Sequence, residues 1–183
     1  PDFSQIESDA EQIEINTTFA LNYDEKRPFF LTGNDLLQTP MYYSRSINNP
    51  LGAGRILGKS GKLSYLLLSS YDRNTVVEVT GEERSNLVST DMKSLANIGR
   101  LRYDFGDESF IGLLGLSRNL EDAGNYVAGL DWTYKFWSNW YFSGEGFLSK
   151  TKELNNTALF GNARKLGSTN HTAAFDGENY SGD

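Results

Sequence analysis

The sequence contains no cysteine and a single histidine, His171, among its 183 residues. Disulfide bonds, thiol catalysis and multi-histidine metal sites are therefore excluded. Proline is scarce, with four residues, and no run of about 18 apolar residues exists that could form a transmembrane helix. Lysine and arginine total 17 against 24 aspartates and glutamates, and the resulting formal net charge of −7 disfavours nucleic-acid binding.

Glycine and aromatic residues are abundant, and the aromatic content of 13% is too high for a disordered chain. From Tyr126 to Phe136 every even-numbered residue is aromatic, alanine or leucine, whereas the odd-numbered residues include Asp131, Thr133 and Lys135. Side chains alternate between the two faces of a β-strand, so this pattern predicts a strand with one apolar face. Helical spacing would instead mix the charges into the aromatic stripe.

The same alternation recurs along the chain and predicts an all-β protein. We expect strands at residues 13–23, 41–47, 53–59, 63–71, 95–105, 109–118, 126–136 and 140–150, and near 157–165. The one helical signal is a single turn at residues 35–37, which Asn34 would cap.

Short and long connections alternate between these strands. Residues 58–61, 106–108 and 137–139 are expected to form tight turns, whereas 72–92, 119–125 and 151–156 are longer polar stretches. This order predicts an up-and-down antiparallel sheet with its short turns at one end, as in an outer-membrane β-barrel. A strand from Leu95 to Phe105 would be about 36 Å long, enough to cross an outer membrane when tilted.

Two sets of residues follow from the barrel interpretation. Aromatic residues flank the tight turns, where a membrane–water interface selects them: Tyr103, Phe105, Phe136, Trp137, Trp140 and Tyr141. Charged residues on the opposite faces are expected to point into the interior: Arg100, Arg102, Asp104, Asp131 and Lys135. They would form either a selective ring or a salt-bridge ladder that plugs the barrel, and the second is favoured because side chains fill small barrels.

The motif Glu25-Lys26-Arg27 precedes Pro28, Phe29 and Phe30. Proline disfavours helical geometry at the residue before it, so we expect Arg27 to be extended, with the two phenylalanines pointing to opposite sides. The aromatic rings would then anchor in apolar surroundings while the charges pair in the interior or at its rim.

This motif and later segments resemble a family of uncharacterised bacterial outer-membrane β-barrel domains that often follow a carbohydrate-binding module of the family 9 type. The resemblance extends from Pro1 to about Lys150. Its residues are Glu25, Lys26, Arg27, Pro28, Phe29, Phe30, Leu31, Gly33, Tyr43, Ser44, Arg45 and Ile47, with a Gly- and Lys-containing hairpin at 58–75. The resemblance implies that the barrel continues beyond Asp183, so that these residues are an internal fragment.

Together these observations predict a single segment, residues 1–183, of an up-and-down antiparallel transmembrane β-barrel in a bacterial outer membrane. Residues 1–50 would hold the motif and the first strands, and residues 51–183 a meander of hairpins. The segment would anchor an extracytoplasmic, carbohydrate-binding module or pass small solutes. Its partners would be the lipid bilayer, the remainder of its own chain and carbohydrate, with no nucleic acid, metal or other cofactor.

Two other classes of function remain open. A soluble all-β carbohydrate-binding module would stack exposed tyrosine and tryptophan rings on sugars. An enzyme has less support, because the sequence offers no nucleophile, base and orienting residue that can be named together. The membrane and soluble classes differ in which face of residues 126–136 meets lipid or solvent.

Overall fold

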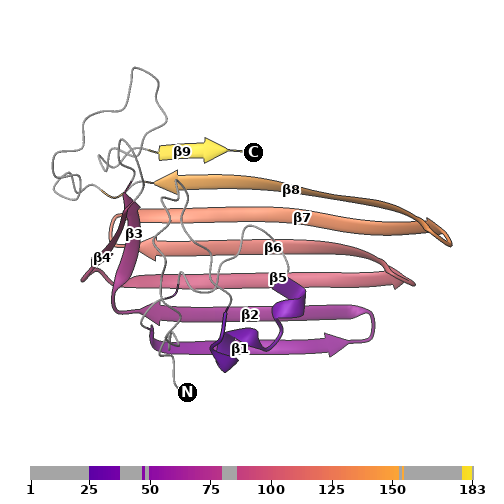
Figure 1. Ribbon diagram of the computed structural model, residues 1–183, viewed down its shortest axis with the longest axis horizontal. Helices are drawn as coiled ribbons and strands as arrows, with labels where there is room; N and C mark the ends of the chain where they lie inside the picture. Colours follow the sequence, from indigo (N-terminus) through magenta and orange to yellow (C-terminus); the bar gives the residue numbers. More distant parts are fainter. Residues whose placement is uncertain are drawn as a thin grey trace, which may run out of the picture.

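The protein is all-β, as a computed structural model shows for residues 25–37, 47, 50–79, 86–152, 154 and 179–182. Six long antiparallel strands form a meander sheet that is not closed into a barrel (Figure 1). The order across the sheet is β1-β2-β5-β6-β7-β8, and the short β9 pairs with the last residues of β8. The long strands are β1 (Pro50–Ser60), β2 (Leu63–Asp72), β5 (Ser94–Gly106), β6 (Ser109–Leu120), β7 (Ala123–Trp137) and β8 (Trp140–Lys152), and β9 is Asn179–Gly182.

The six strands expected from residue 53 to residue 150 are confirmed, and each is somewhat longer than its alternating pattern. A separate two-stranded hairpin, β3 (Thr75–Val79) and β4 (Asn86–Thr90), lies within the long connection between β2 and β5. The strands expected at 13–23 and near 157–165 lie outside the described residues, as does the one at 41–47 apart from Ile47.

Three of the four two-residue turns between the long strands lie together at one end of the sheet, at the right of Figure 1, which is called the tight-turn end below. They join β1 to β2, β5 to β6 and β7 to β8 through residues 61–62, 107–108 and 138–139. At the other end, the expected longer stretch at 119–125 is wrong, because β6 continues to Leu120 and only Glu121 and Asp122 form the turn. Glu121 takes a positive φ of 45°, which lets two residues reverse the chain without glycine.

Two short helices precede the sheet, α1 (Pro28–Leu31) and the 3-10 helix η1 (Asn34–Leu37). Arg27 is extended, with φ −75° and ψ 119°, as expected before proline. However, Phe29 and Phe30 do not point to opposite sides of a strand. Proline favours the first position of a helix, so Pro28 starts a helical turn, and the two rings meet edge to face with centroids 5.1 Å apart.

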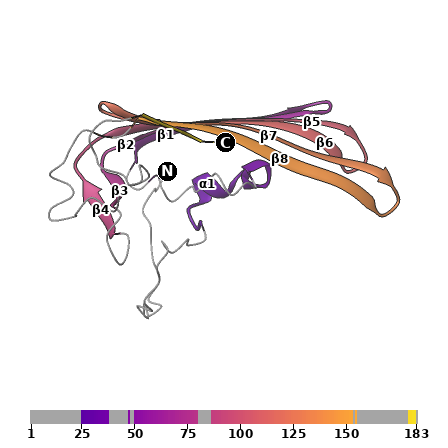
Figure 2. The ribbon, with the colours of Figure 1, turned by 90° about the horizontal axis from the view of Figure 1, so that it is seen from above.

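The core lies between these helices and the concave face of the curved sheet, as Figure 2 shows. Phe30 and Leu37 come from the two helices, and Ile47 comes from the chain that follows them. They pack on a row of sheet residues that are at most 8% exposed: Leu66, Leu68, Ala96, Ile98 and Leu114. The core is therefore one-sided, and the convex face has no cover among the described residues.

We expect Phe30→Ala to lower the free energy of unfolding by about 3–5 kcal/mol, because a ring that is 2% exposed leaves a cavity in this core. Leu31→Ala is the matched control, since Leu31 lies in the same helix but is 45% exposed. Urea unfolding followed by tryptophan fluorescence measures both. Equal losses for the two variants would contradict the packing of α1 on the sheet.

Candidate functional site

The strand register assigns every residue of the long strands to one of two faces. Residues paired directly across an antiparallel sheet share a face. Arg55 pairs with Leu68, which pairs with Ile98, and these residues contact the N-terminal helices or belong to the core beneath them, so they mark the concave face. The concave row on β7 then contains Val127, Gly129, Asp131, Thr133 and Lys135.

Charged residues of the six long strands lie almost entirely on the concave face. They are Arg55, Lys59, Asp72, Arg100, Arg102, Asp104, Arg118, Asp131, Lys135 and Glu145. Within these strands the convex face carries charge at Lys150 and Lys152 alone, both at the end of β8. The two faces do not differ in the sign of their charge, because acidic and basic residues both lie on the concave side. They differ in whether charged residues are present at all.

The convex face is instead a broad apolar surface. Its exposed apolar and aromatic residues are Ile56, Leu63, Leu67, Tyr71, Leu95, Leu101, Tyr103, Phe105, Ile111, Leu113, Tyr126, Leu130, Tyr134, Phe136, Phe142 and Leu148. Leu130 and Tyr134 are 39% and 49% exposed, whereas the Asp131 side chain between them is 24% exposed on the other face. The aromatic face of β7 is thus the uncovered one.

The motif residues Glu25 and Arg27 form an ion pair that is buried on the concave side of the sheet. The guanidinium donates from Nε and Nη2 to the two carboxylate oxygens of Glu25, at 2.9 and 2.8 Å, in the forked geometry that stabilises such pairs. Its Nη1 donates to the carbonyl oxygen of Ile47 at 2.7 Å, and its Cζ lies 4.2 Å from the ring centroid of Phe30. Lys26 is exposed, and Arg45 lies outside the described residues.

Two arginines of the sheet bind backbone carbonyls of the helical segment. Arg55, on β1, donates to the carbonyl oxygens of Phe29 and Thr32, the second at 2.8 Å. Arg100, on β5, donates from Nε to the carbonyl oxygen of Leu36 at 2.9 Å. Carbonyls at the end of a helix lack intrahelical partners, so these arginines supply donors to groups that the short helices leave without one.

The five charged residues expected to gather in the interior form three separate contacts. Arg100 binds Asp131 with both terminal nitrogens, the Nη2–Oδ2 distance being 2.7 Å. Arg102 donates from Nε to Asp104 at 2.8 Å, and its guanidinium lies 3.9 Å from the ring centroid of Phe110. Lys135 contacts neither pair and binds Glu108 in the β5–β6 turn. A single continuous ring or ladder is therefore absent from these residues.

Three further ionic contacts were missed by the sequence interpretation. Arg118 lies 3.6 Å from the carboxylate of Asp72, which is 1% exposed, at the end of the sheet opposite the tight turns. Lys59 lies 3.8 Å from Asp104, and Glu108 binds Lys135, as noted above. The sequence pattern placed Arg118 at the end of an expected strand and Asp72 in a connection, and only the cross-strand register of the structure brings the two together.

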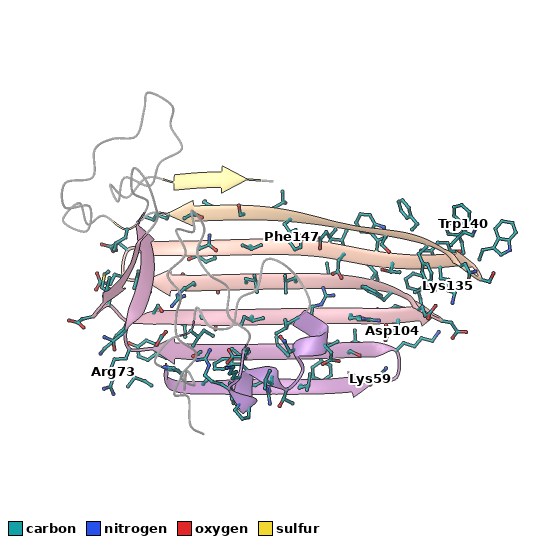
Figure 3. All side chains as sticks on the ribbon, in the orientation of Figure 1. Lys59, Arg73, Asp104, Lys135, Trp140 and Phe147 are labelled. Carbon is teal, nitrogen blue, oxygen red and sulfur yellow. The ribbon has the colours of Figure 1, made fainter. Side chains whose placement is uncertain are left out.

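Aromatic residues gather where β5, β7 and β8 meet the tight turns. Phe105, Tyr134, Phe136 and Trp140 form a chain of rings whose successive centroids are 6.2, 6.3 and 6.4 Å apart. Figure 3 places Trp140 at the tip of this end, and both Trp137 and Trp140 are more than 60% exposed.

Tyr103 lies on the same convex face as Phe105, in the row that pairs with Leu63 and Ile111. Tyr141 differs from the other expected interface residues, because it pairs with Lys135 on the concave side. Its hydroxyl donates to Glu108 at 2.7 Å, and the Lys135 ammonium lies 5.4 Å from its ring centroid.

The described residues contain no group of three or more histidine, aspartate or glutamate side chains placed to hold a metal ion. Within the same residues, no helix has the length and apolar character needed to cross a membrane. The strand register and the exposure of the side chains give the sheet a charged concave surface and an apolar convex one, and the segment 25–37 covers part of the concave surface.

Glu108 supplies a pH test of the turn geometry. Hydrogen bonds from Lys135 and then Tyr141 lower the pKa of its carboxyl. Because the folded pKa lies below the unfolded one, this contact favours the folded state above the unfolded pKa and is lost as the pH falls through the lowered pKa.

We expect Lys135→Met to raise the pKa of Glu108 towards its ordinary value, as measured by NMR titration of the carboxyl carbon. Lys59→Met is the control, because Lys59 lies at the same end of the sheet but contacts Asp104. An unchanged Glu108 pKa in Lys135→Met would argue against the contact.

Comparison with known proteins gives one partial match. No curated protein and no solved structure matches the chain. Residues 1–59, which include the Glu25–Arg27 motif, α1, η1 and nearly all of β1, match a family described as "Domain of unknown function (DUF5916)".

Proposed function

We propose that the sheet is part of the wall of an outer-membrane β-barrel, with its convex face against lipid and its concave face towards the interior. The observation that carries the proposal is the separation of charge between the faces. A charge at the middle of the lipid face of such a barrel costs about 2–4 kcal/mol, so lipid contact selects against it. A soluble sheet has no such requirement on a face that meets water.

The dimensions of the convex face support a membrane span. The 13 residues of β5 are about 43 Å long, or about 30 Å in height when tilted by about 45°. On β8, Trp140 marks one limit of the charge-free region and Lys150 the other. That ten-residue separation corresponds to about 23 Å of height, close to the ~25 Å apolar band of outer-membrane barrels.

The residues at the two limits suit the two interfaces. Exposed tryptophan, tyrosine and phenylalanine at the tight-turn end match the aromatic girdle that sits at headgroup level. At the other limit, Lys150 and Lys152 would extend their ammonium groups to the headgroups while their stems stay in apolar surroundings. The tight-turn end, which holds three of the four two-residue turns, would correspond to the periplasmic end of such a barrel.

Closure of the barrel would require strands beyond the six long ones. The outer edge of β1 has no strand partner among the described residues, and β8 pairs with β9 only from Ser149 to Lys152. We assign these edges to the remainder of the same chain. In this arrangement the protein has no enzymatic role and anchors an extracytoplasmic module, for which a carbohydrate-binding module is our candidate.

A soluble carbohydrate-binding module is the second candidate, and the exposed Trp137 and Trp140 rings favour it, since such rings stack on sugars. It would have to keep the whole convex face in water. Soluble monomers rarely expose apolar patches larger than about 300–600 Å², whereas the apolar row here extends over all six strands. We therefore prefer the membrane proposal.

Depth-dependent fluorescence quenching tests the orientation, because the only tryptophans are Trp132, Trp137 and Trp140. In single-tryptophan variants reconstituted in brominated lipids, we expect Trp132 to be quenched best by bromines deep in the acyl chains. Trp137 and Trp140 should be quenched best by bromines near the headgroups, because they would lie about 12 Å farther along the membrane normal than Trp132. Equal quenching at all depths, or none, contradicts the proposal.

Placing a charge on each face provides a second test. We expect Leu130→Arg to destabilise the folded protein in lipid by about 2–4 kcal/mol, because Leu130 would lie at mid-depth on the lipid face. Ser143→Arg is the control, on the concave face of the neighbouring strand, and should cost under about 1 kcal/mol. Denaturant unfolding in lipid vesicles measures both, and similar costs for the two variants would count against lipid contact.

A further inference from the structure

The N-terminal segment, residues 25–37, occupies the concave face at the middle of the strands. Its hydrophobic contacts centre on Leu66 and Leu68, which lie halfway along β2. Figure 2 shows α1 on the concave side of the curved sheet, well away from the tight-turn end. If that side is the interior of a barrel, the segment lies at mid-height in the bore.

The sheet beneath the segment is apolar where the rest of the concave face is polar. On β5 the concave row runs from Asp104, Arg102 and Arg100 to Ile98 and Ala96. Ile98 and Ala96 are 6% and 8% exposed because Phe30, Leu37 and Ile47 cover this part of the sheet. In a water-filled bore, Ile98 and Ala96 would be exposed to water. Their apolar side chains are therefore better explained if the N-terminal segment covers them permanently.

Two arginines fix the segment from neighbouring positions on the wall. Arg55 binds the carbonyl oxygens that end α1, and Arg100 binds the carbonyl oxygen of Leu36 in η1. Asp131, on β7, holds the guanidinium of Arg100 in place through two further hydrogen bonds. Arg102 lies on the same strand and face as Arg100, but it binds Asp104 and Phe110.

We propose that the N-terminal segment is a plug that closes the bore, with Arg55 and Arg100 as its latches. The protein then holds a module at the membrane and does not conduct solutes. This inference rests on the proposed function and deepens it, because a closed bore suits an anchor and excludes the passage of solutes that the sequence also suggested.

Planar bilayer recordings of the full-length protein test the plug, after liposome flotation has established insertion. We expect the wild-type protein to stay almost silent. Arg55→Ala/Arg100→Ala should raise the open probability about tenfold or more, because it removes several hydrogen bonds from charged donors to the segment. Arg102→Ala is the matched control and should behave like the wild type.

A labelling experiment provides a second readout that needs no channel current. The sequence has no cysteine, so Leu37→Cys introduces a single thiol at a position that is 4% exposed. A membrane-impermeant maleimide should label it slowly in the wild-type background and about tenfold faster with Arg55→Ala/Arg100→Ala. If that double variant does not fold, Arg100→Lys keeps the charge but loses the fork to Asp131 and should give a smaller increase of the same sign.

The outcomes separate the plug from the function on which it rests. A protein that does not float with liposomes overturns the proposed outer-membrane function. A protein that floats and already conducts in the wild-type form, with the same open probability in the double variant, overturns the plug alone. Silent recordings and slow labelling in every variant contradict the latch role of the two arginines.

Discussion

The alternation of side chains across the six long strands is the constraint on which the rest of the structure depends. Because of it, one chain presents two surfaces with different solvent requirements. Acidic and basic residues both lie on the concave side, and the convex side is free of charge until Lys150. A register shift of one residue would move every one of these side chains to the wrong face.

The concave face is itself divided, and this division explains how charges can be buried there. Below the N-terminal segment the wall is apolar and packs against Phe30. Around that area the charges are paired: Arg27 with Glu25, and Arg100 with Asp131. Desolvating an unpaired guanidinium would be costly, so the forked carboxylate contacts and the carbonyl acceptors allow arginines to lie beside a hydrophobic core.

The strands were predictable from the sequence because each carries its own period-two signal. On β2 the signal is weaker, since Leu66 and Leu68 are apolar on the face that should be polar. The structure gives the reason. Leu66 and Leu68 belong to the same hydrophobic core as Phe30, which lies more than thirty residues earlier in the sequence. A local pattern contains no information about such a partner.

The candidate site was predictable in its residue types but not in its pairings. Arg100, Asp131 and Lys135 were assigned to one face correctly, yet Lys135 pairs with Glu108 rather than with the other two. The pairing depends on the register between strands and on turn geometry, including the positive φ of 58° at Glu108. The helical turn of Phe29 and Phe30 was not expected from the sequence. Pro28 restricts only the residue before it, Arg27, to extended geometry, and it favours a helix start for the residues that follow.

Within the described residues, the outer edge of β1 has no strand partner and the convex face has no cover, and these two features place linked demands on the environment of the sheet. Backbone groups along β1 need strand partners, and in hydrocarbon each unsatisfied group costs several kcal/mol. Lipid contact on the convex face is therefore tolerable only if further strands also satisfy the edges. Conversely, closure in water would leave the apolar convex residues exposed on the outside of the barrel. Membrane insertion and completion of the strand pairing should consequently be coupled, because each removes a cost that the other alone would leave.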